Sequence, residues 1–182
     1  MNPIKATARG AAVLGLALLA GCSWLPWSHK KAEACPAAIV LEPLKHTAVF
    51  AAGARPAPQS VAFYGIIDEV NATCEYAAGA VRLKLAVVVI GERGPAGRGS
   101  GSDAVDFNYF VAATGPGQRI LAKTPFRVHI VFPGGKPRAG VTDHIEETIP
   151  LNGLKGPEAT LDVGFQQSPE VVDFYRHFRG RL

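Results

Sequence analysis

The segment 81–90 alternates its side chains with a period of two, which is the pattern of a half-buried β-strand and not of a helix. Its apolar residues share one face: Val81, Leu83, Leu85, Val87 and Val89. The opposite face begins with two cationic residues and then turns apolar: Arg82, Lys84, Ala86, Val88 and Ile90. A strand that is apolar on both faces is typical of the centre of a sheet.

Shorter runs along the chain indicate further strands. They lie at 38–41, 47–52, 60–70, 105–111, 126–132, 145–149 and 161–165. Turn-forming segments rich in glycine and proline separate them, at 54–59, 115–118, 133–138 and 152–157. About eight short strands with such turns predict an all-β fold, an antiparallel β-sandwich of immunoglobulin-like or Greek-key architecture. A small β-barrel is the alternative.

The segment 168–179 departs from the strand pattern and predicts a short C-terminal helix. Ser168 suits the N-cap, and Pro169 suits the first helical position. Apolar residues then recur at helical spacing: Val171, Phe174, Tyr175 and Phe178. Such a short helix is marginal alone, so we expect its three aromatic side chains to pack on the sandwich and cap one open end. The alternative is that its basic end, 176–181, lies on a membrane or a partner.

The start of the chain has the layout of an exported protein. Lys5 and Arg9 are the only charged side chains before residue 22, and an unbroken small and apolar run lies at 11–20. A basic start followed by such a run is typical of a secretory signal peptide, which we assign to residues 1–21. The run is too short for a transmembrane helix, which needs about 20 apolar residues.

The residues that end this run, Leu19-Ala20-Gly21-Cys22, resemble the lipobox of bacterial lipoproteins. The resemblance implies that the Cys22 thiol carries a diacylglycerol, that the chain is cut before Cys22, and that the new amine is acylated, for example with palmitate. Ser23 stands where aspartate would retain a lipoprotein in the inner membrane, which favours the periplasmic face of the outer membrane. An ordinary signal peptide with a chance cysteine at its end is the alternative.

Residues 22–34 have the character of a membrane-proximal linker. Trp24 and Trp27 follow the lipidated cysteine at the depth where headgroups favour an indole ring. Lys30 and Lys31 come next and suit anionic headgroups. We therefore expect the tryptophans to hold the linker against the membrane, and packing on the folded domain is the alternative.

Two cysteines remain after lipidation, Cys35 and Cys74. Export places them in an oxidising compartment, which predicts a disulfide between them. The alternatives are metal ligation or a reactive thiol, and metal ligation lacks a C-x-x-C pair or a nearby histidine cluster. Cys35 then marks the start of a single domain, 35–182, which the disulfide ties to the end of the third strand.

Composition limits the function classes. The hydrophobic content of 48% argues against disorder. Lys5 and Arg9 supply two of the formal net charge of +4, so the mature chain carries only +2. It also lacks a basic run with interleaved aromatic residues, and we expect no nucleic-acid partner. We expect neither a metal nor another cofactor.

The glycine-rich segment 91–104 imitates the start of a phosphate-binding loop. The lysine that reaches the phosphates is missing, and strands are expected on both sides. We interpret the segment as a long mobile hairpin loop, with Arg93 and Arg98 as candidate contacts to a partner. His144 and Glu146 share one face of a strand without a third ligand, so we expect an exposed polar face and not a zinc site.

Four short segments of the mature chain are together similar to a group of Gram-negative envelope lipoproteins: Cys35-Pro36, Cys74, Arg93-Gly94-Pro95 and Tyr109-Phe110-Val111-Ala112. The group brings no known activity to the comparison. We expect no enzyme; a periplasmic hydrolase is a distant alternative, because catalytic triads assemble from residues far apart in sequence. The expectation is a non-catalytic envelope interaction or structural module with a filled core. The alternative is a binding module with a cavity for a lipid or small apolar ligand.

Overall fold

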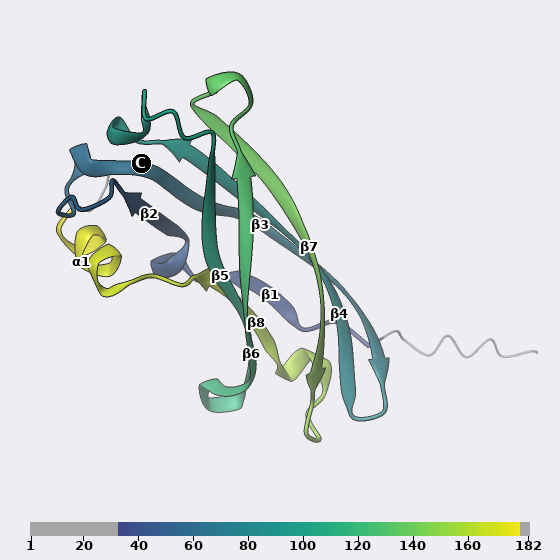
Figure 1. The fold of residues 1–182 in the computed structure, drawn as a ribbon. Coiled ribbons are helices and arrows are strands. Elements are labelled where there is room, and N and C mark those ends of the chain that lie inside the picture. Colours follow the sequence, from purple (N-terminus) through teal and green to yellow (C-terminus); the bar gives the residue numbers. More distant parts are fainter. Residues whose placement is uncertain (1–32, 179–182) are drawn as a thin grey trace, which may run out of the picture. The chain divides into compact units, whose positions relative to one another are not determined.

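Residues 33–178 are described by a computed structural model, and they form eight strands and one helix (Figure 1). The chain divides after Ala32, and every described element belongs to the second unit. The strands are β1 (Ala37–Val40), β2 (His46–Phe50), β3 (Val61–Ala77), β4 (Ala80–Arg93), β5 (Ala104–Gly115), β6 (Arg119–Val131), β7 (Arg138–Pro150) and β8 (Thr160–Phe165). The helix is α1 (Pro169–His177). No helix among residues 33–178 is long and apolar enough to cross a membrane.

The strands form two four-stranded sheets, which confirms the predicted β-sandwich and not a closed barrel. One sheet has the order β1-β8-β5-β6, and the other has the order β2-β3-β4-β7. Neighbouring strands are antiparallel except β1 and β8, which run parallel. The sandwich is therefore antiparallel, as predicted, with one parallel pair at this edge. No hairpin connects β1 to β8, so the connection does not impose an antiparallel direction.

The core lies between the inner faces of the sheets. The five apolar residues that alternate along 81–89 are each at most 2% exposed, which confirms the predicted alternation. β4 lies between β3 and β7, in the interior of its sheet as expected. Across the sandwich, β5 and β8 contribute large buried side chains: Phe107, Tyr109 and Phe165.

Several strands are longer than the sequence pattern indicates. β3 has 17 residues where the pattern marks only 60–70, and β6 and β7 also begin earlier than expected. The register between β3 and β4 shifts at Asp68, where β3 carries one extra residue. Such a β-bulge exchanges the two faces of a strand, so no single alternation continues through it. The second half of β3 therefore does not stand out in the sequence.

α1 lies close to its predicted position. The Ser168 hydroxyl accepts a hydrogen bond from the backbone amide of Val171, as an N-cap does. Val171 and Phe174 are each only 6% exposed. Phe174 packs in a small apolar cluster with residues of β2 and β3, outside the main core. Phe178 follows the last helical residue and stays 46% exposed, so the expectation that all three aromatic side chains pack is wrong for Phe178.

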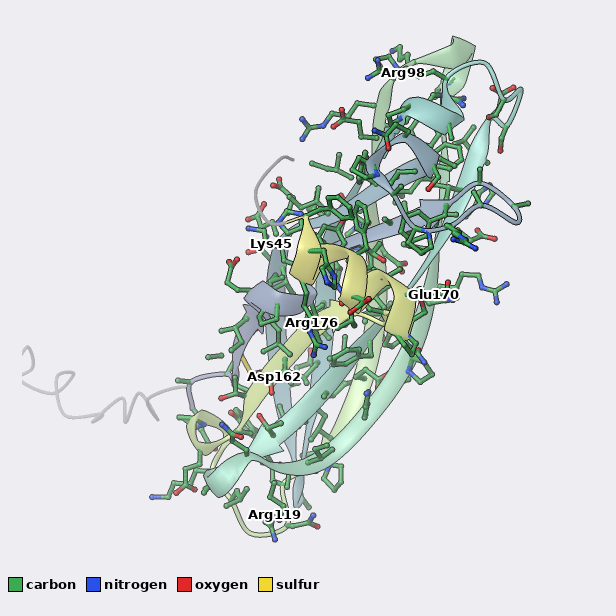
Figure 2. All side chains as sticks on the ribbon, turned by 90° about the vertical axis from the view of Figure 1, so that its left-hand side faces the viewer. Lys45, Arg98, Arg119, Asp162, Glu170 and Arg176 are labelled. Atoms are coloured by element: carbon green, nitrogen blue, oxygen red, sulfur yellow. A yellow bond between two sulfur atoms is a disulfide. The ribbon has the colours of Figure 1, made fainter. Side chains whose placement is uncertain are left out.

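We name the two ends of the sandwich the entry end, where the described chain begins, and the far end (Figure 1). The entry end holds residues 33–35, the β3–β4 turn, the β5–β6 turn and the β7–β8 loop. The far end holds the loops at 51–60, 94–103 and 132–137. Arg119 marks the entry end and Arg98 the far end in Figure 2.

Candidate interaction surface

The outer face of the sheet β2-β3-β4-β7 carries two main hollows and a third of about 140 Å3 at Glu75 and Arg82, and we term it the hollow face. The larger hollow, of about 390 Å3, lies across β3, β4 and β7. It is lined by Asn71, Ala72, Thr73, Lys84, Leu85, Ala86, His144, Ile145 and Glu146. The smaller hollow, of about 230 Å3, is lined by His46, Tyr64, Gly65, Ile66, Ile90, Glu92 and Arg138. Residues from four strands thus share one open surface.

Apolar side chains form the floor of the hollow face. Ile66, Ala86, Val88 and Ile90 are half-buried, and they pack against neither of the two apolar clusters of the domain. β4 pairs with β3 on one side and with β7 on the other, so neighbouring strands shield these side chains laterally. The described helix, α1, packs beside this strip, in a cluster with residues of β2 and β3 that includes Tyr64. An apolar strip that is open to solvent on the outer face of a sheet is typical of a contact surface.

Polar and charged side chains surround this strip. Lys84 Nζ lies 4.0 Å from Glu146 Oε1, and both side chains are mostly exposed, so this ion pair contributes little to stability. His144 is also exposed on this face, which agrees with the expected polar strand face. Among residues 33–178, no three His, Cys, Asp or Glu side chains gather as metal ligands would.

His46 lies between the smaller hollow and α1. Its Nδ1 atom is buried and has no hydrogen-bond partner within residues 33–178. The rings of His46 and Tyr175 lie 6.3 Å apart. Burial, followed by the charge of Lys45, lowers the pKa of His46, and Glu42 opposes this effect. Sequence reasoning missed His46, because one histidine at the start of a strand carries no signal of burial.

Tyr109 and Asp143 join the two sheets. The buried Tyr109 hydroxyl donates a hydrogen bond to Asp143 Oδ2 at 2.8 Å. Burial, with this hydrogen bond and the charge of Asp143, raises the pKa of Tyr109. A phenol that keeps its proton this firmly is no general acid or base near neutral pH. We interpret the contact as structural, since a buried hydroxyl needs a partner.

His129 and Asp106 form a second polar contact, on the outer face of the other sheet. His129 Nδ1 lies 2.7 Å from Asp106 Oδ1, and both side chains are about half exposed. A hydrolytic triad also needs a hydroxyl or thiol bonded to the histidine. Within residues 33–178, His129 receives no hydrogen bond from a serine, threonine or cysteine. The pair therefore does not complete a triad in the described chain.

Arg93 is buried at the far end. Its side chain is only 7% exposed, and its guanidinium donates to the backbone oxygens of Gly97, Ser102 and Lys136. Arg93 Nη2 also lies 3.2 Å from Asp103 Oδ1. These bonds hold the loop 94–103 closed and connect it to the turn between β6 and β7.

The aromatic neighbours of Arg93 explain its burial. Its guanidinium carbon lies 4.9 Å from the centre of the Phe132 ring and 5.6 Å from that of Phe63. The expectation that Arg93 contacts a partner is wrong, because its hydrogen bonds go to its own chain. Residues 91–93 belong to β4, so the loop is also shorter than expected. Arg98 is exposed at the far end and stays a candidate contact.

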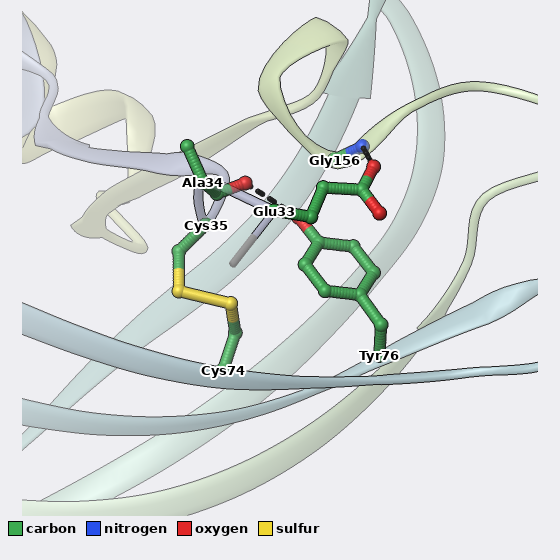
Figure 3. The surroundings of a disulfide bond; sticks show 6 residues. All are labelled: Glu33, Ala34, Cys35, Cys74, Tyr76 and Gly156. Atoms are coloured by element: carbon green, nitrogen blue, oxygen red, sulfur yellow. Dashed lines mark hydrogen bonds between the residues drawn. A yellow bond between two sulfur atoms is a disulfide. The ribbon is translucent and has the colours of Figure 1, made fainter. Parts of the chain in front are cut away.

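The predicted disulfide joins Cys35 to Cys74, with their Cα atoms 5.7 Å apart (Figure 3). Two hydrogen bonds reinforce this attachment. The Tyr76 hydroxyl donates to the Ala34 carbonyl at 2.6 Å, and the Gly156 amide donates to Glu33 Oε1 at 3.3 Å. The start of the domain is thus tied both to β3 and to the β7–β8 loop.

The predicted lipidation and membrane contacts lie outside the described residues. They concern Cys22, Trp24, Trp27, Lys30 and Lys31. These assignments stay predictions of the sequence.

Comparisons with known proteins give no further guide to the site. No protein-family model matches the chain, and no curated protein or solved structure matches it at a significant level.

Proposed function

We propose that this chain is a lipid-anchored lipoprotein of the bacterial outer membrane. Its sandwich would lie at the periplasmic face and contact another envelope component as a non-catalytic module. The lipobox-like residues 19–22 support the anchor, and Ser23 supports the outer membrane. The disulfide supports export, because structural disulfides persist mainly in oxidising compartments.

The hollow face carries the interaction part of this proposal. Protein interfaces combine an apolar centre with a polar rim, and this face has both. The other sheet differs at its interior strand β5. Phe110 of this strand is only 8% exposed, because Lys123 Nζ lies 4.2 Å from its ring centre and Leu44 packs over Gly164 beside it. The exposed apolar side chains of that sheet, Ile39, Ile120 and Val131, lie on its edge strands β1 and β6, so the two sheets differ in the cover over their interior strands.

The interior favours this function over ligand carriage. A carrier of a lipid or small apolar ligand encloses most of its ligand in a cavity. Here large aromatic side chains from both sheets pack against one another in the core, with the Phe63 and Phe132 ring centres 5.3 Å apart and those of Phe107 and Phe165 5.7 Å apart. The hollows of the hollow face are open to solvent and are not enclosed cavities.

Photo-crosslinking in intact cells tests the interaction. Thr142 is exposed on the hollow face and pairs with Val88. A photoreactive amino acid at Thr142 should join the chain to a defined envelope protein. The matched control is Asn108, which is exposed on the outer face of the other sheet. Equal crosslinking from both positions, or none from Thr142, contradicts the proposal.

The variant Cys22→Ser tests the anchor. It should lose its acyl groups in mass spectra and leave the membrane fraction for the soluble or unprocessed fraction. A variant that is still acylated and membrane-bound contradicts the lipoprotein assignment.

A further inference from the structure

We propose that the β5–β6 turn at the entry end rests on the lipid surface that holds the chain's own anchor. This inference depends on the proposed lipid anchor and adds an orientation of the domain on the membrane. It concerns the tip formed by Arg119 and Ile120, with Lys155 of the neighbouring loop. The partner is a bilayer with anionic headgroups.

The turn presents an apolar side chain to solvent. Gly117 and Gln118 both have a positive φ, of 68° and 60°, which turns the chain sharply before β6. Ile120 is 63% exposed, whereas Val131 at the other end of the same strand is 52% exposed. An exposed isoleucine beside an arginine suits a lipid interface, where the apolar group enters the acyl boundary and the cation meets headgroups.

Strand pairing places this tip near the start of the domain. Ile120 pairs with Thr114, Thr114 with Thr160, and Thr160 with Ala37. These four residues form one row across the sheet. With strands about 4.8 Å apart, Ala37 and Ile120 lie about 14 Å from each other. The first strand therefore enters the sheet at the level of the tip.

The length of the linker limits where the tip can lie. Cys22 precedes Glu33 by 11 residues, which reach at most about 38 Å when fully extended. Val131, at the other end of β6, lies 11 residues beyond Ile120, about 36 Å along the strand. The linker could reach the far end only when almost fully extended, so it favours the entry end beside the bilayer.

The charges at this end also suit an anionic surface. Neither Arg119 nor Lys155 pairs with a carboxylate of residues 33–178. Two exposed acidic residues nearby accept hydrogen bonds from amides of the β7–β8 loop and not from these cations: Glu158 accepts from the Lys155 amide, and Glu33 accepts from the Gly156 amide. Arg119 and Lys155 can therefore meet headgroup phosphates.

A fluorescent label on the lipidated full chain tests the contact. Because Cys22 is acylated and Cys35 and Cys74 are joined, the variants Ile120→Cys and Val131→Cys each carry one free thiol. The two positions are matched, since both are exposed β-branched residues of β6, 63% and 52% exposed. Each variant is labelled with an environment-sensitive fluorophore and reconstituted in vesicles of phosphatidylethanolamine and phosphatidylglycerol. Nitroxide-labelled lipids then report proximity to the bilayer.

We expect blue-shifted emission and several-fold stronger quenching at position 120 than at position 131. Reversing the charges with Arg119→Glu and Lys155→Glu should reduce this difference. Aqueous emission at both positions, in a chain that mass spectrometry shows to be acylated and that floats with vesicles, overturns the inference and leaves the anchor intact. An unacylated chain overturns the proposed function itself. Shielding at position 120 in cells but not in vesicles assigns the tip to a protein and also overturns the inference.

Discussion

At the entry end, a covalent bond between Cys35 and Cys74 joins the start of the domain to β3. At the far end, the loop 94–103 is held by Arg93 through hydrogen bonds and two aromatic rings. Both segments would otherwise be loosely attached. The disulfide also restricts the unfolded chain, whereas Arg93 acts only in the folded state.

This difference predicts which end of the domain opens more readily in local fluctuations. Local opening of a protein begins where few buried contacts hold a segment. The entry end stays linked even when neighbouring hydrogen bonds break, and a lipid anchor would pull on this end. We therefore expect amides of the far-end loops to exchange with solvent faster than those around Cys74.

Removing the disulfide has the largest expected effect. Cys35 and Cys74 are 39 positions apart, and a loop of that size corresponds to about 4 kcal/mol in the chain-entropy model. The double variant Cys35→Ala and Cys74→Ala should lose about this much free energy of unfolding, measured by denaturant titration. The control is the unaltered chain with reductant, which should match the variant. An unchanged midpoint would show that the disulfide adds no stability.

Truncating a helix side chain tests the non-covalent support along β2. Phe174 is 6% exposed and lies 5.2 Å from Phe50, ring centre to ring centre. Phe174→Ala should cost about 3 kcal/mol, as for a buried aromatic residue. Phe178 is the matched control on the same helix end, and because it is 46% exposed, Phe178→Ala should cost below about 1 kcal/mol. Equal losses would contradict the packing of α1 described above.

Replacing Arg93 tests the far end directly. Arg93→Met keeps much of the apolar stem but leaves carbonyl oxygens in the loop without their donor, which should cost about 2 kcal/mol. Hydrogen exchange should quicken in the loop 94–103 and not around Cys74. The exposed Arg98 is the matched control, and Arg98→Met should change stability by less than about 0.5 kcal/mol. A uniform change in exchange over the whole domain would remove the contrast between the two ends.

The entry end was the more predictable of the two. With Cys22 assigned to the proposed anchor, Cys35 and Cys74 are the two cysteines that remain, so the sequence alone indicates their bond. The alternation along β4 is equally local, because one strand displays both of its faces within a few residues. Turn residues such as those at 115–118 also act locally and were placed correctly.

The far end and the hollow face depend on distant contacts. The sequence made Arg93 a candidate partner contact, because its aromatic neighbours, Phe63 of β3 and Phe132 just after β6, are distant in the chain. The outward apolar residues of β4, such as Val88, did indicate a central strand. Whether another element packs over these side chains depends on how the whole chain folds. The pattern of a single segment therefore does not predict it. The bulge at Asp68 likewise conceals half of β3.

Acidification has the smallest expected effect on the stability of the domain. Burial lowers the pKa of His46 below its ordinary value of 6.5, so the unfolded chain takes up a proton that the folded chain resists. The stability from neutral His46 is complete above about pH 6.5 and is lost as the pH falls through the folded value. We expect a loss below about 1 kcal/mol near pH 5.5, where most carboxylates stay ionised. Amides of β2 should exchange faster than at pH 7.5 after correction for intrinsic rates, while those around Cys74 should not. The variant His46→Gln should lose this part of the pH dependence, whatever its own stability. If the stability of His46→Gln depends on pH as that of the unaltered chain does, then protonation of His46 does not destabilise β2.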